Sequence, residues 1–208
     1  MRLSPKRFNR HLNHMGQDFA WRRAYACPCV NPNSGSPKPN CPNCSGKGRL
    51  WDAAVAGKAG IVGRDQMKAF AAFGMWDQGD IMLSIPSDSP LYGIGQFDRV
   101  AATNRSEPFS LNLVRGVNDL IRFPILSIER VFWLVNEVPT DASPVSLLPD
   151  GRIQWGEIAP PINATYSVTG RRTPEYFCYT ELPADRPMHF GETLPRRVAL
   201  RRFDLFGR

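Results

Sequence analysis

Four cysteines lie between residues 27 and 44, and they restrict the fold more than any other feature of the sequence. They form two pairs, Cys27-Pro-Cys29 and Cys41-Pro-Asn-Cys44. The intervening residues 30–40 are too rich in proline, asparagine, serine and glycine for a regular strand or helix. The sequence therefore predicts a loop that can place four sulfur atoms around one tetrahedral ion.

Zinc is the metal that this ligand set favours. Thiolates are soft ligands, and zinc has no geometric preference from its d electrons. Four cysteines leave no coordination position for water, so Cys27, Cys29, Cys41 and Cys44 predict a structural rather than a catalytic Zn²⁺ ion. The following Ser-Gly46-Lys-Gly48 resembles the second half of a zinc-ribbon or DnaJ-type knuckle, whose glycines turn backbone amides toward the sulfurs.

Other interpretations of the cysteines remain open. A disulfide within either pair would be strained at such short range, although crossed pairing is compatible with an oxidising compartment. A redox-active C-x-x-C is disfavoured, because no thioredoxin-like βαβ pattern surrounds it. His11 or His14 could replace one sulfur ligand, or both could lie on a polar helix face. Cys178, in an aromatic strand-like segment, is interpreted as a core residue.

Length and composition are those of a folded protein with one core, or one core and a small module. The 208 residues are 42% hydrophobic and 22% charged. No apolar run approaches the ~20 residues that span a bilayer. The N-terminus has no apolar segment of a secretory signal, which with reduced cysteines predicts assembly in a cytoplasm.

The net charge of +7 is concentrated near the two ends. Such basic segments can contact nucleic-acid phosphates, pair with acidic faces of neighbouring subunits, or form a solvated surface. The basic residues concerned are Arg2, Lys6, Arg7, Arg10, Arg22 and Arg23 at one end, and Arg196, Arg197, Arg201, Arg202 and Arg208 at the other.

The rest of the chain predicts one helix and many short strands. Residues 4–15 predict a helix with Ser4 as N-cap and Pro5 at the first position. Residues 49–55 and 59–63 predict a hairpin around Gly57, and residues 106–110 a turn. Residues 66–73 fit either a strand or a helix. Further strands are expected at 19–26, 79–85, 98–102, 111–115, 119–123, 125–135, 146–148, 152–155, 166–170, 175–180 and 197–203.

Strand signals about every ten residues, separated by turn residues, predict an all-β fold. We expect a mainly antiparallel β-barrel or sandwich, a short N-terminal helix and a small zinc-bound loop module. The expected division is an N-terminal arm with the four-cysteine zinc module at 1–50, and a β domain with long loops and a basic C-terminal arm at 51–208.

No catalytic motif is present, and the chain is predicted not to be an enzyme. The sequence contains no nucleophile elbow, His-Glu-x-x-His motif or phosphate-binding glycine loop. His189 is the one candidate base, but a histidine beside Phe190 is more often packed than catalytic. The segment from Phe19 to Tyr25 mixes aromatic and basic residues, which fits base stacking or, more simply, a strand with one buried aromatic face.

Three stretches resemble a family of tailed-bacteriophage neck proteins, the head–tail connector and stopper structural proteins. They are Ala26-Cys-Pro-Cys29 through Cys41-Pro-Asn-Cys-Ser-Gly-Lys-Gly48, residues 79–92 with 97–100, and residues 194–208. Because they span most of the chain, the similarity is to a complete protein rather than to a zinc module alone. Connector, stopper and tail-terminator positions all fit.

The resemblance implies a non-enzymatic β-barrel subunit in a virion ring of six or twelve copies between portal and tail, lining or closing the DNA channel. The implied partners are further copies of the chain, portal or connector proteins and tail proteins, with non-specific contact to packaged DNA and none to membrane. The alternative function is a zinc-ribbon nucleic-acid-binding module fused to a β-barrel.

Overall fold

A computed structural model describes residues 4–62, 79–143, 145–182 and 188–206. The strand or helix expected at 66–73 lies outside these residues. The protein is mainly β, with one α-helix among the described residues, and two compact units divide the chain. The barrel unit comprises residues 1–104 and 175–208, and the sheet unit comprises residues 105–174. No described helix has both the length and the apolar character that a membrane span requires.

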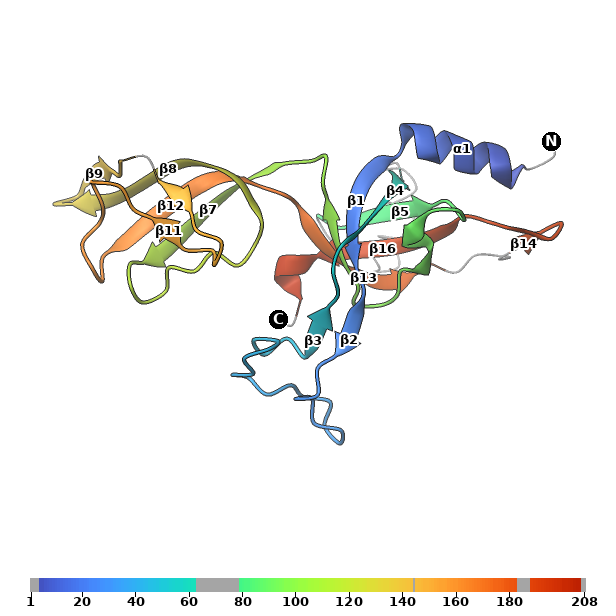
Figure 1. The fold of residues 1–208 in the computed structure, drawn as a ribbon, viewed down its shortest axis with the longest axis horizontal. Helices are drawn as coiled ribbons and strands as arrows, with labels where there is room; N and C mark the ends of the chain where they lie inside the picture. Colours follow the sequence, from blue (N-terminus) through green and yellow to red (C-terminus); the bar gives the residue numbers. More distant parts are fainter. Residues whose placement is uncertain (1–3, 63–78, 144, 183–187, 207–208) are drawn as a thin grey trace. The chain divides into compact units, whose positions relative to one another are not determined.

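The barrel unit contains a closed barrel of six strands, in the order β1-β4-β5-β16-β13-β6, with β6 pairing back to β1 (Figure 1). All its pairings are antiparallel. The strands are β1 (Gln17–Arg22), β4 (Val55–Ile61), β5 (Ile81–Ile85), β6 (Arg99–Ala102), β13 (Glu175–Glu181) and β16 (Arg196–Arg202). The predicted all-β class with a barrel is therefore confirmed.

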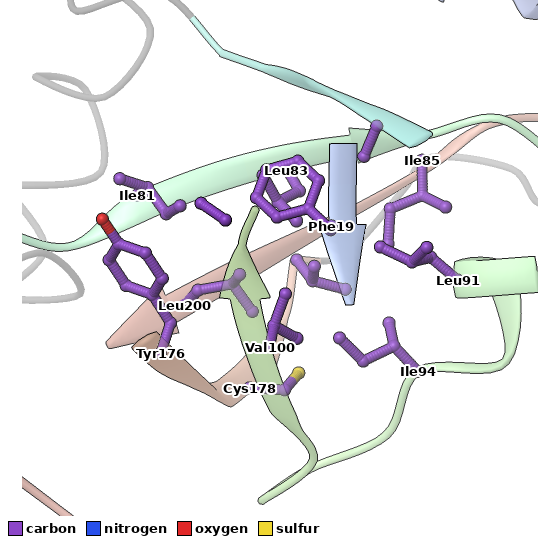
Figure 2. Close-up of a cluster of buried hydrophobic side chains, with 13 residues drawn as sticks. Phe19, Ile81, Leu83, Ile85, Leu91, Ile94, Val100, Tyr176, Cys178 and Leu200 are labelled. Carbon is purple, nitrogen blue, oxygen red and sulfur yellow. The ribbon is translucent and has the colours of Figure 1, made fainter. Parts of the chain in front are cut away.

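The barrel interior is filled with side chains. Phe19, Leu83, Val100 and Leu200 come from four different strands and are at most 1% exposed (Figure 2). The 3₁₀ helix η1 (Pro90–Gly93) adds Leu91, which is fully buried in the same cluster. A small barrel packed in this way has no room for a ligand or a channel.

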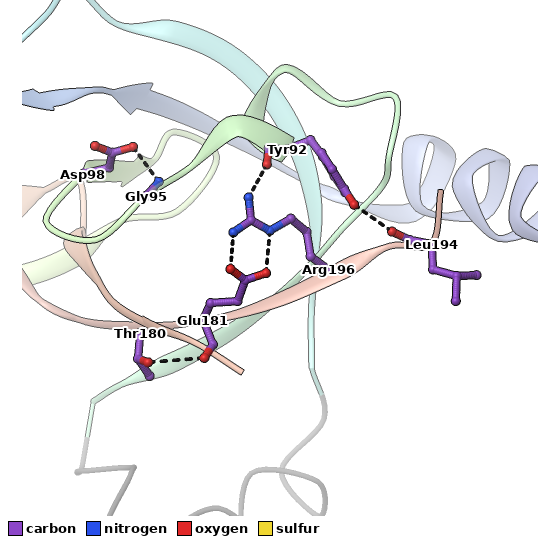
Figure 3. A network of polar contacts seen from close by, with 7 residues as sticks. All are labelled: Tyr92, Gly95, Asp98, Thr180, Glu181, Leu194 and Arg196. Carbon is purple, nitrogen blue, oxygen red and sulfur yellow. Dashed lines mark hydrogen bonds and ion pairs between the residues drawn. The ribbon is translucent and has the colours of Figure 1, made fainter. Parts of the chain in front are cut away.

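Arg196 ties η1 to two barrel strands. Its guanidinium makes two parallel hydrogen bonds to the Glu181 carboxylate, at 3.0 and 2.7 Å, and a third to the carbonyl oxygen of Tyr92 (Figure 3). The Tyr92 hydroxyl donates to the carbonyl of Leu194 at 3.0 Å. A bidentate arginine–carboxylate pair of this kind holds the two side chains in one relative orientation and also pairs their charges.

The N-terminal helix α1 (Pro5–Met15) confirms the predicted helix. The carbonyl of Ser4 accepts the first helical hydrogen bonds, although the Ser4 side chain makes no cap bond. Leu12 is the buried apolar residue of α1, whereas Phe8 and Met15 are exposed.

The sheet unit is a four-stranded antiparallel sheet in the order β7-β12-β8-β9. Its core contains Phe109, Val131, Trp133, Tyr166 and Val168. The strands are β7 (Glu107–Val114), β8 (Ile125–Val135), β9 (Val138–Asp141) and β12 (Thr165–Arg172), and a small hairpin joins β10 (Ser146–Leu147) to β11 (Ile153–Gln154).

The chain is divided differently from the expected boundary at residue 50. Strand β1 lies before this boundary, yet it pairs with β4 and β6 and closes the barrel. The strand predicted at 197–203 is confirmed as β16 (Arg196–Arg202), which lies between β5 and β13 in the barrel. Barrel closure needs strands from both ends of the chain, and local sequence patterns do not reveal such pairings.

Three local predictions are also wrong. Residues 106–110 do not form a turn but begin β7, which tolerates Pro108 because it lies at the edge of its sheet. Residues 119–123 form only an isolated bridge, between Leu120 and Arg152. The predicted strand 19–26 is divided into β1 and β2 (Ala24–Ala26).

The hairpin predicted around Gly57 is wrong as well. Gly57 lies inside the continuous strand β4, whereas β3 (Arg49–Trp51) pairs with β2. A Cβ atom at residue 57 would overlap the side chain of the buried Leu91. Gly57 therefore serves close packing of η1 on β4 rather than a turn.

Replacing Gly57 by alanine should destabilise the barrel by about 1–3 kcal/mol, because Leu91 would have to move within a filled core. The control is Gly93→Ala, where a new Cβ would meet only Trp21 at an ordinary 3.5 Å. Urea denaturation of both variants measures the difference. Equal midpoints would show that the Leu91 contact does not constrain residue 57.

Candidate metal centre

The four cysteines lie on a loop that leaves the barrel through the two-stranded β2–β3 ladder (Figure 1). Ala24 pairs with Trp51, Tyr25 with Leu50, and Ala26 with Arg49. Cys27 follows β2 directly, and Gly48 immediately precedes β3. The ladder thus brings the two ends of the loop together.

Asp98 fixes the point at which the chain leaves the barrel. Its carboxylate is 3% exposed and accepts hydrogen bonds from Trp21 Nε1 and the Ala24 amide, both at 2.7 Å. The Gly95 amide donates a third bond at 2.8 Å (Figure 3). A buried carboxylate with three N–H donors is well satisfied. The sequence places Asp98 at the start of a strand, but it does not reveal the bonds to Trp21 and Ala24, which are 77 and 74 residues away in the chain.

The four sulfur atoms converge, and all lie within 4.8 Å of one another. Sγ of Cys27 lies 3.8 Å from Sγ of Cys41, and Sγ of Cys29 lies 3.5 Å from Sγ of Cys44. A tetrahedral ion with four metal–sulfur bonds of about 2.3 Å requires sulfur–sulfur separations of about 3.8 Å. The donor set therefore fits one thiolate-bound metal ion.

Backbone hydrogen bonds hold the loop around the sulfurs. The Cys27 amide donates to the Gly48 carbonyl at 2.9 Å, and the Gly48 amide donates to Sγ of Cys44 at 3.3 Å. Gly48 has a φ of +70°, a conformation that side chains other than glycine rarely adopt. The predicted role of a glycine in turning an amide toward a sulfur is thus confirmed at Gly48.

The thiols differ in acidity. Backbone amides of Cys44 and Asn43, which hydrogen-bond its sulfur, lower the pKa of Cys41 to about 6. Burial raises the pKa of Cys29 to about 12, although the backbone amide of Lys38 opposes this effect. Cys41 can therefore carry negative charge near neutral pH, whereas Cys29 retains its proton.

All four residues are free cysteines in the structure. The two short separations join the first cysteine pair to the second, so they match the crossed disulfide pairing, but both far exceed the ~2.05 Å of a disulfide bond. Cys27, Cys41 and Cys44 are buried, and Cys29 is partly exposed. With four sulfurs as ligands, the site is closed to water or substrate.

An aromatic cluster connects the base of this loop to the barrel. Phe206 is 8% exposed, and its ring meets those of Trp51, Phe97 and Phe177 at centroid distances of 4.9–6.0 Å. Lys47 Nζ donates to the Phe206 carbonyl at 3.4 Å. The C-terminal 3₁₀ helix η2 (Phe203–Leu205) therefore packs against residues that flank the cysteines. In the sequence, only the three-residue spacing of Phe203 and Phe206 hinted that the C-terminal segment packs as a short helix.

The other candidate residues do not join the cysteines. Among the described residues, the ligand atoms close enough for one ion come from the four cysteines alone. His11 and His14 lie on α1, and β1 and β2 separate them in sequence from Cys27. Cys178 is a core residue, as predicted, and burial raises its pKa to about 12.

The candidate base His189 and the aromatic segment from Phe19 to Tyr25 both lie in strands that pair with other strands. His189 lies on β14 (Met188–His189), opposite Glu192 of β15 (Glu192–Thr193), with its ring against Phe190 at 4.5 Å. Phe19 points into the barrel core and Trp21 binds Asp98, which supports a strand with a buried aromatic face in this segment.

Comparison with known proteins yields no family model that matches the chain and no curated protein with significant similarity to it.

Binding of Zn²⁺, the ion that the sequence predicts, should weaken as the pH falls. Zinc binds thiolates, so every protonated thiol must lose its proton, that of Cys29 included, and the apparent affinity should fall at least tenfold per unit of pH between about pH 8 and pH 6. Protonation of Cys41 should steepen this dependence below about pH 6. Competition titrations with a chromophoric chelator measure the slope. A pH-independent affinity would contradict binding by these thiols.

Proposed function

We propose that this protein is a structural subunit of a tailed-bacteriophage neck, in which a zinc ion bound by Cys27, Cys29, Cys41 and Cys44 braces the loop. The observation that carries a structural role is the convergence of four sulfurs within 4.8 Å. Because protein ligands would occupy every position of a tetrahedral ion, the metal could hold a surface in shape but could not activate water. The neck assignment itself comes from the sequence resemblance.

Zinc is the proposed ion because of the donor chemistry. Four thiolates suit zinc and iron rather than the hard cations magnesium and calcium. Zinc also favours the closed tetrahedral arrangement that the sulfur separations match. Structural zinc contributes on the order of 10 kcal/mol to folding in small peptides. We expect a smaller contribution here, since the barrel has its own core.

The barrel architecture suits a ring subunit whose channel lies between copies. The barrel interior is filled by residues such as Phe19 and Leu83, so DNA cannot pass through one subunit. We propose that six or twelve copies assemble between portal and tail proteins in the virion. In such a ring, the channel surface consists of outward-facing residues from each copy. Assembly in the host cytoplasm would keep the cysteines reduced.

The distribution of charge favours one further candidate, a zinc-ribbon nucleic-acid-binding module on a β-barrel. Residues 105–174 contain seven basic and seven acidic residues, so the entire net charge of +7 belongs to the barrel unit. Several of its basic side chains are nevertheless paired within the chain: Arg196 with Glu181, Arg201 with Asp80 and Arg99 with Glu175. This pairing makes the candidate the weaker one.

Replacing Cys41 by serine should abolish metal binding and loosen the cysteine loop at residues 27–48 while the barrel remains folded. The matched control is Cys178→Ala, which removes a buried thiol from the barrel core and should lower thermal stability without changing metal content. Elemental analysis and thermal unfolding of both variants provide the measurements. Unchanged zinc and melting temperature in Cys41→Ser would contradict the four-sulfur site.

Locating the chain in assembled particles tests the neck role. Purified tailed virions should contain this subunit as a ring between portal and tail, visible by electron cryomicroscopy with a labelled chain. Its absence from purified virions would contradict the proposal. Strong binding to DNA or RNA by the free chain, with affinity falling steeply as salt rises, would instead support the nucleic-acid-binding candidate.

A further inference from the structure

Exposed apolar side chains gather at one end of the sheet unit. Among the described residues, six large hydrophobic side chains are more than 60% exposed, and four of these are Val117, Leu134, Val138 and Ile162. The other two, Met15 and Phe190, belong to the barrel unit. A soluble chain rarely leaves several such side chains together without a partner.

The strand register places these four residues and Val135 at one end of the sheet, where Leu134 faces the opposite side from Val135 and Val138 because neighbours in a strand alternate. Val114 at the end of β7 pairs with Thr165 at the start of β12, and Tyr166 pairs with Trp133 near the end of β8. Val135 pairs with Val138 across the turn to β9 (Figure 1). Val117 follows β7 and Ile162 precedes β12, and Ile162 lies close to Gly116. We name Val117, Leu134, Val135, Val138 and Ile162 the distal patch.

The distal patch lies at the end of the sheet opposite its chain connections. Strand β7 begins at Glu107, just after the chain enters the unit, and β12 ends at Arg172, just before the chain leaves it. These two residues pair with each other and form an ion pair of 2.7 Å. The patch is therefore at the end of the strands opposite these chain connections.

The turn that presents the patch is well defined. Asn136 and Glu137 both have positive φ, of 48° and 67°, as in the tight turns that suit the twist of a β-hairpin. Arg130 and Asp141 close the same hairpin with an ion pair of 2.6 Å. A rigid apolar tip loses little conformational entropy when it docks.

We propose that the distal patch docks onto a second copy of this chain. The sheet unit has seven basic and seven acidic residues, so two copies can approach through it without net charge repulsion, whereas contact through the barrel units would oppose like charges. A neutral apolar surface also offers no electrostatic gain to a strongly charged partner. The proposal deepens the self-association in the proposed function by naming its surface.

Five aliphatic side chains are few compared with the 20–30 residues per side of a typical stable interface. Association through this patch should therefore be reversible and depend on concentration. In a closed ring each copy would contribute such a contact, so many weak contacts would act together.

The test is size-exclusion chromatography with light scattering on the full chain over a range of concentrations. Wild type should associate as concentration rises, whereas a Val138→Glu and Ile162→Glu double variant should stay monomeric. The matched control is Leu126→Glu, which changes a side chain of similar exposure near the start of β8, at the opposite end of the sheet. This control should associate like wild type.

The possible outcomes distinguish failure of the docking proposal from failure of the proposed function. Wild type that remains monomeric at its highest soluble concentration, or a double variant that associates equally well, would overturn the docking proposal. Val117→Glu, in a turn outside the strand ladder, provides a second variant if the double variant fails to fold. Zinc content of the same samples reports on the metal site, and virion imaging reports on the neck role, so either can fail independently.

Discussion

The loop from Cys27 to Gly48 forms no strand or helix, although the structure describes all of it, so its conformation depends on the contacts of four cysteine sulfurs and on the backbone hydrogen bonds around them. A loop of this length has little apolar surface to bury, and conformational entropy opposes any single arrangement. Sulfurs 3.5 and 3.8 Å apart in two crossed pairs match the edges of a metal-centred tetrahedron. One ion could therefore replace the hydrophobic core that the loop lacks.

Contacts at the base of the loop explain how a bound metal ion would stabilise the loop against the rest of the barrel unit. Asp98 holds Trp21 and Ala24 on one side, and Phe206 packs on Trp51 at the other end of the loop. These residues belong to the barrel or to the C-terminal segment that packs on it. A metal-bound loop attached at both ends in this way would present a surface of fixed shape, as a subunit of a larger assembly requires.

The two units carry different surface properties. All of the net charge belongs to the barrel unit, while the sheet unit is neutral and has most of the highly exposed aliphatic side chains. Long-range electrostatic forces therefore act mainly on the barrel unit, and short-range hydrophobic contact is available mainly to the sheet unit.

Several elements were predictable because their signals are local. The helix at α1 begins with Ser4 and Pro5, β5 alternates apolar residues, and the pair Asp150-Gly151 marks the β10–β11 hairpin. Gly57 and Pro108 misled the prediction, because a glycine can serve packing as well as turning and a proline is compatible with an edge strand. No feature of the neighbouring sequence distinguishes a packing glycine from a turn glycine, or an edge-strand proline from a turn proline.

The sequence by itself determined the candidate ligand set, since four cysteines at these spacings fall within one loop without regular structure. It also determined the β class through the spacing of strands and turns. Only the tertiary structure decided that residues 17–22 and 196–202 close one barrel, that Phe206 packs beside the cysteine loop, and that Val117 and Val138 lie at the same end of a sheet. These contacts join residues far apart in the chain, and their free energy comes from shape and burial that no single segment encodes.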